Sequence, residues 1–445
     1  MGDRRMILGI ELGKSYGVHP GAWRMPGADS DAYTTVDSHV RGAQAAERGG
    51  LDFLFFPDRV FLHGNPSHTP PNFAMEPMLV LAVVARETSR IGLVASASTS
   101  FNEPYTLARQ FRALDVMSNG RAGWNSIPSF EPEAFANYGR PLPAREDKYE
   151  RLHETIQITQ ALWGSWDRAA GRPDPASGRY ADPNHIRPVN LQGRHVGSRG
   201  PIQIPPSEQG QPVILMPAAS GSGLQAAGMY ANVIFGGPAT IDECRMQQDI
   251  ARSAARAGGR TAEDVKFLAF MNVGLGATKR DALDRRRALE EHADLPSRLA
   301  QLSMLLGVEI DAARADEPLT PQRLAHLRPH PGAARSAQAA DLARDGWSPL
   351  DILAHGVLDP GAGVVGTPDE AADLMQKWFE AGVCDGFIFL PDDQRDNIDD
   401  IANMLVPILR RRGLRAADYQ GTTLRDHLGL PEQLGIDPRL AHASE

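Results

Sequence analysis

The sequence is poor in cysteine and has no long apolar run. Of its 445 residues only Cys244 and Cys384 are cysteines, which excludes a disulfide framework and fits a reducing compartment. No stretch of 18 consecutive apolar residues occurs, so no membrane-spanning helix is predicted. The first apolar stretch is too short for a secretory signal peptide. We therefore expect a cytoplasmic protein with no membrane partner.

Positive charge is also scarce. Lys and Arg number 46 against 55 Asp and Glu, so the net charge is −9. The densest basic run is Arg410–Arg412, with Arg415 just after it, and it follows an apolar helical segment. Cations are favourable at the C-terminal end of a helix, which explains this run without a ligand. No nucleic-acid partner is predicted.

Familiar catalytic signatures are missing as well. No G-x-S-x-G nucleophile elbow occurs. The His153-Glu154 pair begins like a zinc-protease motif, but Gln157 occupies the position of the second histidine. We predict no metal site, and no nucleophile–base pair identifies a catalytic residue.

Short apolar runs separated by helical patterns recur along the chain. Continuous apolar runs are expected of parallel strands that are buried on both faces. Leu152, Ile156 and Trp163 form one helical stripe, and Thr367 and Glu370 predict a capping box at the start of another helix. The alternation predicts an α/β fold, a (β/α)8 TIM barrel. The predicted strands are 6–12, 53–56, 91–98, 122–127, 213–216, 232–235, 267–273 and 386–390.

Two segments interrupt this alternation. Residues 167–210 are rich in Pro, Gly and Arg, and residues 295–365 are partly helical and rich in Ala and Arg. We interpret residues 1–445 as one barrel domain with insertions around 167–210 and 295–365 at its C-terminal face, where insertions shape active sites.

Polar residues follow several of the predicted strands. Asp58 comes after the second strand, Ser96 lies in the third, Asn125 lies in the fourth and Ser220 follows the fifth. The C-terminal ends of barrel strands carry the functional groups of this architecture. Hydroxyl, amide and carboxylate groups at these ends predict a site that holds a polar cofactor.

The segment 217–226, PAASGSGLQA, predicts an anion site. A Gly/Ser loop that opens a helix presents backbone N–H groups to a phosphate, which assigns Ser220 and Gly221 to cofactor binding. Gly221, Gly223 and Ala226 also match the dinucleotide fingerprint, but the next strand ends without the acidic residue that would bind a ribose. A merely glycine-capped turn is the alternative.

Arg145 and Tyr149 are four residues apart at the start of a predicted helix, so they share a face. A guanidinium group and a phenol there suit a phosphate or a ribityl chain. The alternative is a surface arginine beside a core tyrosine.

Several strings resemble one protein family. The most specific are SNGRAGWN at 118–125 and the tail GTTLRDHLGL at 421–430, and others include GAWRMPGA at 21–28 and VGTPDEAADLMQKWFEAGVCDGFIFLP at 365–391. The chain resembles the flavin monooxygenases related to bacterial luciferase, in the branch of nitrilotriacetate monooxygenase and dibenzothiophene-sulfone monooxygenase.

This resemblance implies a two-component enzyme. It would take reduced FMN from a separate NAD(P)H-dependent flavin reductase and insert one oxygen atom from dioxygen into a small organic substrate. The resemblance assigns FMN binding to Asp58, Ser96, Arg145, Tyr149 and Ser220. A homo-oligomer, either a dimer or a tetramer, is expected.

The chain departs from the family pattern at three places. Arg145 replaces the usual histidine, the phosphate loop reads Ala218-Ala219-Ser220-Gly221, and Ser126-Ile127-Pro128-Ser129 follows Asn125. Two alternatives stay open: a deazaflavin-dependent oxidoreductase with the same barrel, and a non-catalytic flavin-binding protein. The sequence does not identify the organic substrate.

Overall fold

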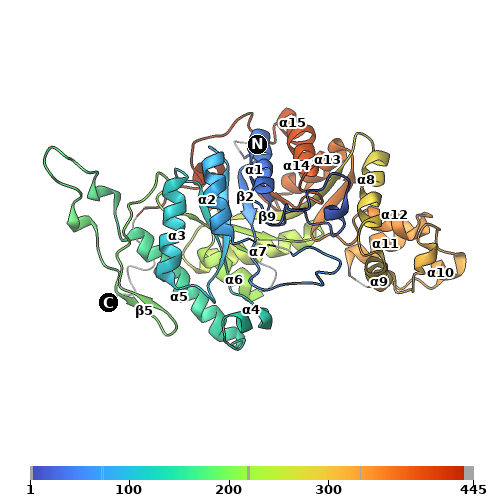
Figure 1. Cartoon of the computed structure of the whole chain (residues 1–445), viewed down its shortest axis with the longest axis horizontal. Coiled ribbons are helices and arrows are strands. Elements are labelled where there is room, and N and C mark those ends of the chain that lie inside the picture. The colour runs from blue at the N-terminus through green and yellow to red at the C-terminus, as the bar shows by residue number, and fades with distance from the viewer. Residues whose placement is uncertain (1–3, 72, 74, 218–220, 331, 435–445) are drawn as a thin grey trace.

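A closed ring of parallel strands forms the centre of the molecule (Figure 1). The computed structural model describes residues 4–71, 73, 75–217, 221–330 and 332–434. Within these residues, each of eight parallel strands pairs with its neighbours, and β11 pairs with β1 to close the ring. The predicted TIM barrel is confirmed. The ring runs β1 (Ile7–Glu11), β2 (Phe53–Phe56), β3 (Gly92–Ser98), β4 (Ala122–Ile127), β7 (Val213–Pro217), β8 (Val233–Gly236), β9 (Lys266–Leu275) and β11 (Gly386–Phe389).

The strands are mostly apolar because nearly all of their residues are buried on one face or the other. In β1, Leu8 and Ile10 belong to the core between the strands and the surrounding helices, whereas Ile7 belongs to the core inside the barrel. Side chains alternate between these two cores with the period of a strand. Gly9 also faces inward, where a Cβ atom would lie 2.3 Å from the ring of Phe53. A glycine is needed there because Phe53 fills that part of the interior.

The helical layer follows the expected alternation. The predicted capping box is confirmed, since Thr367 and Glu370 bond reciprocally at the start of α13 (Pro368–Glu380). The other helices beside the barrel are α1 (Asp37–Gly49), α2 (Pro77–Glu87), α3 (Pro104–Met117), α4 (Pro132–Asn137), α5 (Arg145–Gly164), α6 (Gly221–Tyr230), α7 (Ile241–Ala257), α8 (Lys279–Glu291), α14 (Asn397–Asp400) and α15 (Val406–Arg411).

One strand lies outside the set that the sequence predicts. Strand β10 (Ala362–Gly366) falls at the end of the segment interpreted as an insertion, and it pairs with residues 271–275 of β9. β11 pairs with the preceding part of β9, residues 268–271. The ten-residue β9 therefore extends beyond the ring and carries β10 on its second half.

The tail string GTTLRDHLGL closes the N-terminal end of the barrel. Its short helix α16 (Leu424–Leu428) begins with a capping box between Thr423 and Asp426. Leu424 and Leu428 pack with Val94 and other residues inside the barrel. A Cβ atom on Gly92 would lie 2.4 Å from Leu424, so the leucine enters the barrel between small residues. The tail thus has a structural role.

The two insertions lie at opposite ends of the view in Figure 1. Residues 295–358 form helices packed around a core of their own, with Leu302, Ala340 and Leu353 fully or almost fully buried. These helices are α9 (Leu295–Leu306), α10 (Pro321–Ala325), α11 (Ala334–Arg344) and α12 (Pro349–Ala354).

The segment 167–210 projects from the body as an arm. It leaves the end of α5 and returns to β7, so it joins a helix to a strand. On its return, Gln209 donates to the carbonyl of Ala122 at the start of β4, 2.9 Å away. Its short hairpin, β5 (Leu191–Gln192) with β6 (Gly197–Ser198), packs against α5 and α3 through β6. The base of this arm therefore lies nearer the N-terminal ends of the strands than we expected from the sequence.

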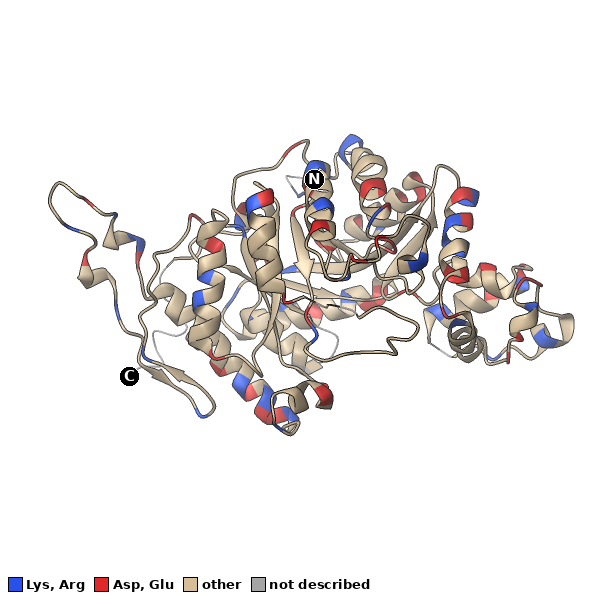
Figure 2. Cartoon of the chain, viewed as in Figure 1, with Lys and Arg blue, Asp and Glu red and all other residues tan. Residues whose placement is uncertain are grey.

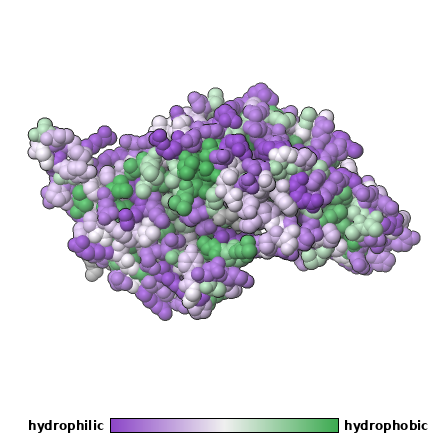
Figure 3. Space-filling model, viewed as in Figure 1, coloured by the Kyte–Doolittle hydropathy of each residue, from purple (hydrophilic) through white to green (hydrophobic). Residues whose placement is uncertain are grey.

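The surface carries charges of both signs. Figure 2 shows Lys and Arg interspersed with Asp and Glu over the visible elements, without a basic stripe. Exposed apolar side chains include Leu79 and Val83 of α2 and Met117 of α3. Figure 3 shows apolar surface near the middle of the visible face, with polar surface around it. In the described part of the chain, no helix is long and apolar enough to cross a membrane. The predicted oligomeric state and cytoplasmic location stay predictions.

Candidate active site at the barrel mouth

The C-terminal ends of β3 and β4 present two bonded polar side chains to the barrel interior. Ser96 is in phase with Val94, which lies in the inner core, so it faces inward. Asn125 is its register partner on β4, and its Nδ2 donates to Ser96 Oγ at 2.7 Å. The Oδ1 atom of Asn125 is buried and has no hydrogen-bond partner among the described residues. This free acceptor faces the region where the sequence predicts a polar cofactor.

The loops after these strands are held rigidly. Ser98 Oγ lies 2.9 Å from Ser129 Oγ, and the backbone N–H of Ser129 donates to Ser100 Oγ at 3.2 Å. The Thr99 N–H also donates to the carbonyl of Ile127. The mouth therefore keeps its shape without a ligand, which lowers the entropic cost of binding.

Aromatic rings lie across the inside of the barrel beneath these polar groups. Phe55 of β2 packs edge-on against Phe235 of β8, with ring centroids 5.0 Å apart. Phe235 in turn packs against Phe270 of β9 at 5.5 Å. We call Phe55, Phe235 and Phe270 the aromatic floor. A flat aromatic ligand with polar edges suits a site built from this floor and the Ser96–Asn125 pair.

Asp58 lies two residues beyond β2. Burial, together with the charge of Glu76, raises its pKa to about 6, although the backbone N–H of Arg59 opposes the shift. Burial also raises the pKa of Tyr138, and the charges of Asp58 and Glu76 add to this shift. These groups are therefore close together at the rim. A partly buried carboxyl group that titrates near neutral pH is typical of a functional site.

Arg145 and Tyr149 share a face at the start of α5, as predicted. The guanidinium carbon lies 5.7 Å from the centroid of the Tyr149 ring. Arg145 is exposed, whereas Tyr149 is half-buried against the outer core. No described contact joins this pair to Asp58, Ser96 or Asn125, so their shared role stays a prediction.

The predicted phosphate loop is only partly described. Ser220 lies outside the described residues. Gly221 is the first residue of the ten-residue α6, and a Cβ atom placed on it would meet no atom of the described residues within 4 Å, its chain neighbours aside.

Sequence reasoning missed Glu11 and the aromatic floor. Glu11 is the last residue of β1 and lies on the same face of the strand as Ile7, which points into the barrel. Its carboxyl group therefore lies in the barrel mouth, and Glu11 is 8% exposed. The sequence carries no clear signal for Glu11, because a glutamate at the end of a strand also fits a solvent-exposed position, and which face of β1 points inward is known only from the closed barrel. The floor phenylalanines could be placed inward only once the register of each strand was known.

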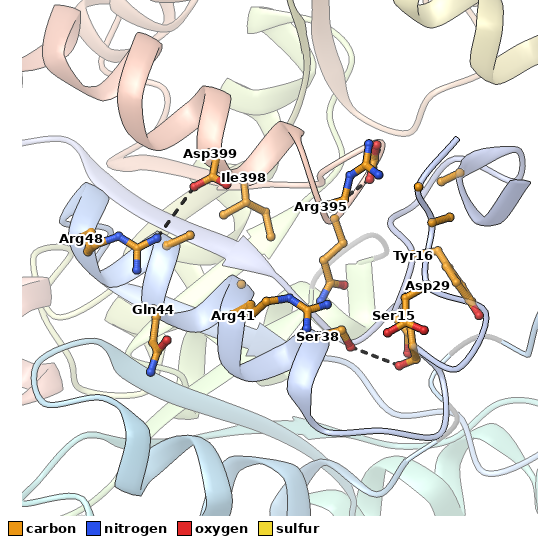
Figure 4. Close-up of a pocket in the computed structure, with 18 residues that line it drawn as sticks. Ser15, Tyr16, Asp29, Ser38, Arg41, Gln44, Arg48, Arg395, Ile398 and Asp399 are labelled. Atoms are coloured by element: carbon orange, nitrogen blue, oxygen red, sulfur yellow. Dashed lines mark hydrogen bonds and ion pairs between the residues drawn. The ribbon is translucent and has the colours of Figure 1, made fainter. Parts of the chain in front are cut away.

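A second cavity lies outside the ring of strands. It has a volume of about 270 Å³ and lies between α1 and the segment that leads into α14 (Figure 4). Arg48 of α1 and Asp399 of α14 approach to 4.0 Å across it, while Arg41 lies on the same side as Arg48. Its lining comes from α1, the loop after β1 and the segment around α14, and it does not include Ser96, Asn125 or Phe235 of the barrel mouth.

One exposed cluster among the described residues has the spacing of metal ligands. Asp147, Glu150 and His195 have oxygen and nitrogen atoms within 4.8 Å of one another. Arg194 already lies 2.9 Å from Glu150, and His195 bonds to the same carboxylate. These contacts account for the cluster as a surface network that holds the arm hairpin to α5.

The sequence of the chain matches a known family over most of its length. Residues 19–385 match the model of the luciferase-like monooxygenases. The chain belongs to this family.

Relatives of this luciferase-like protein lie in the branch that the sequence strings indicated. Nitrilotriacetate monooxygenase component A of Aminobacter aminovorans is 33% identical, over 96% of this chain and 97% of the relative. Dibenzothiophene-sulfone monooxygenase of Rhodococcus erythropolis is 30% identical, over 92% of this chain and 93% of the relative. The predicted resemblance is confirmed.

A solved structure shares the fold and was determined with a flavin. Riboflavin lyase RcaE, solved with modified FMN and riboflavin, superposes with a TM-score of 0.79 at 27% identity. The alignment covers 99% of this chain and all of that one.

Proposed function

We propose that the chain is the oxygenase component of a two-component, reduced-FMN-dependent monooxygenase. It takes reduced FMN from a separate NAD(P)H-dependent flavin reductase and inserts one oxygen atom from dioxygen into a small organic substrate. The family match over residues 19–385 carries this proposal. It is supported by a rigid barrel mouth with an aromatic floor and an unpaired amide oxygen on Asn125.

The residues of the mouth fit the parts of FMN. The flat ring suits the aromatic floor, and its polar edge suits Ser96 and Asn125. Asp58 suits the hydroxyls of the ribityl chain, because a carboxylate accepts hydrogen bonds from them. We assign the phosphate to Ser220, Gly221, Arg145 and Tyr149, since backbone N–H groups at a helix start and a guanidinium group favour an anion.

The reduced flavin supplies the electrons that activate dioxygen, so the protein is left to bind, orient and exclude water. Ser98 and Ser129, which contact each other, are buried, as is Phe235 of the floor, and this burial limits the access of water to the interior side of the mouth. Because the flavin carries out the redox chemistry and the protein only binds and orients the reactants, no nucleophile–base pair is needed.

Formation of an oxygenated product tests the activity. The chain is mixed with a flavin reductase, NADH and FMN, and the oxygenated product is measured for a panel of aminopolycarboxylates, sulfones and N- or S-heterocycles, because free reduced FMN consumes dioxygen even without an oxygenase. We expect product formation with at least one compound and with reduced FMN, and none with a reduced deazaflavin. Turnover with the deazaflavin alone would instead support the deazaflavin-dependent oxidoreductase. Tight FMN binding without oxygenation of any compound would favour a non-catalytic flavin-binding protein.

Ser220→Ala tests the phosphate assignment. A hydrogen bond to a charged group is worth about 1.5–3 kcal/mol. We therefore expect about tenfold to a hundredfold weaker binding of reduced FMN. Anaerobic fluorescence titration measures it, and unchanged affinity would remove the phosphate from this loop.

A further inference from the structure

Glu11 is the exception among the buried carboxylates of the described residues. Six Asp and Glu residues are buried there, and five of them accept a hydrogen bond from a described neighbour. The Oε1 atom of Glu11 is fully buried and has no hydrogen-bond partner among the residues that the structure describes. The six are Glu11, Asp52, Asp115, Glu290, Asp392 and Asp393.

The neighbours of Glu11 do little to stabilise its carboxyl group. Its register partner on β2 is Phe55, a member of the aromatic floor. Burial raises the pKa of the Glu11 carboxyl, and the charge of Lys14 opposes this shift only in part. Burying an unpaired carboxyl group costs free energy, so Glu11 does not stabilise the fold. An uncompensated polar group of this kind points to a ligand.

The chemistry of that ligand follows from the acceptors. Glu11 Oε1 and Asn125 Oδ1 are both buried, both lie at the C-terminal end of an inner strand face, and both lack a donor. An ionised carboxylate only accepts hydrogen bonds, and an amide oxygen does the same. The bound molecule must therefore bring N–H or O–H groups, and a cationic nitrogen would also neutralise Glu11.

We propose that Glu11 is a ligand-recognition residue that accepts a hydrogen bond from an N–H group of the molecule bound in the barrel mouth. The inference rests on the proposed function, which places a flavin and an organic substrate at this site. The N–H group comes from the flavin ring or from the substrate. In the second case the substrate class is amines and N-heterocycles, and hydrocarbons are disfavoured because they leave Glu11 unpaired.

Two variants of Glu11 and three probe ligands distinguish an N–H group of the flavin from one of the substrate. Glu11→Leu removes the acceptor, and Glu11→Gln keeps one acceptor but removes the charge. Glu317→Gln is the control. Glu317 is an exposed carboxylate in the helical insertion, where it forms an ion pair with Arg314. The probes are reduced FMN, followed anaerobically by fluorescence, and benzylamine against benzyl alcohol, followed by calorimetry with the FMN-bound protein.

If the N–H group belongs to the substrate, the wild type binds benzylamine at least tenfold more tightly than benzyl alcohol. Glu11→Leu then abolishes that preference, Glu11→Gln reduces it, and FMN affinity is unchanged. If it belongs to the flavin, Glu11→Leu weakens FMN binding by about tenfold to a hundredfold with no amine preference in the wild type. Either result supports the proposal.

The proposal is overturned if folded Glu11→Leu and Glu11→Gln proteins match the wild type in FMN affinity and in amine preference. Thermal melts check folding, and we expect Glu11→Leu to raise the Tm of the ligand-free protein because it removes a buried unpaired carboxyl. A wild type that binds benzylamine selectively in buffer without flavin, but never binds FMN, would refute the proposed function while leaving the Glu11 inference intact.

Discussion

At the N-terminal end of the barrel, Asp52 accepts hydrogen bonds from the Leu8 N–H and from Arg415, whereas at the C-terminal end Glu11 Oε1 accepts none. Asp115, also at the N-terminal end, accepts from Ser207, Gln209 and the Ala122 N–H. Both ends are buried and both contain carboxylates. The difference indicates that one end is built for stability and the other for binding.

Breaking the buried ion pair of Asp52 and Arg415 should cause the largest loss of stability. Asp52→Ala leaves the Arg415 guanidinium without its carboxylate in a dry site. Removing one partner of a buried pair costs about 3–5 kcal/mol of the free energy of unfolding. Urea unfolding measures this loss, and FMN affinity of the folded fraction should stay the same.

Asp341→Ala is the matched control, because Asp341 pairs with Arg344 on the exposed face of α11. Its expected cost is about 1 kcal/mol or less. Equal losses in the two variants would contradict a stabilising role for the N-terminal end.

The tail helix gives the next largest effect. Leu424→Ala empties a fully buried position inside the barrel, and large-to-small changes of this kind cost about 2–5 kcal/mol. Leu79→Ala on α2 is the control, since Leu79 is 71% exposed. If Leu424→Ala were as stable as Leu79→Ala in thermal unfolding, the tail would not close the barrel.

The sequence predicted much of the frame and part of the site. The ring strands could be found because each is a continuous apolar run, and the Ser96–Asn125 contact follows from two adjacent strands ending at one edge. Strand β10 was missed because AGVVG, with two glycines and only two β-branched residues, follows a helical segment. β10 can pair with β9 only because β9 extends to residue 275, and the sequence does not show how long β9 is.

The role of the tail and of Glu11 depends on distant contacts. Leu424 meets Gly92 and Gly123 only after the barrel closes, so no local pattern places it inside. A glutamate at the end of a strand also fits a solvent-exposed position, and only the alternation from Ile7 directs it inward. Local sequence patterns predict the helices and strands. Contacts between residues far apart in the sequence determine which side chains occupy the two ends of the barrel.

Asp58 at the mouth gives the smallest expected change in stability, and its sign depends on pH. Its pKa in the folded protein is about 6, above the ordinary value of 3.8. Below about pH 3 the carboxyl is protonated in both the folded and the unfolded state, so it does not change the free energy of unfolding. As pH rises to 6 the unfolded chain releases the proton first, so stability falls, by about 1–3 kcal/mol for a shift of this size.

Asp58→Asn should therefore stabilise the flavin-free protein at about pH 7.5 and leave its stability unchanged at about pH 3. Thermal melts at the two pH values measure this difference. A variant that is less stable than the wild type at pH 7.5 would show that the Asp58 carboxylate holds the loop in place, which would weaken the contrast between the two ends.

Hydrogen–deuterium exchange with and without FMN tests the central claim most directly, because it locates the ligand on the whole chain. The account predicts slower exchange on FMN binding in the backbone around Asp58, in 96–102 and in 125–130, with no change in 421–430 at the closed end. Protection confined to α1 and the segment before α14, around the cavity of Arg41 and Asp399, would contradict it and move the flavin away from the barrel mouth.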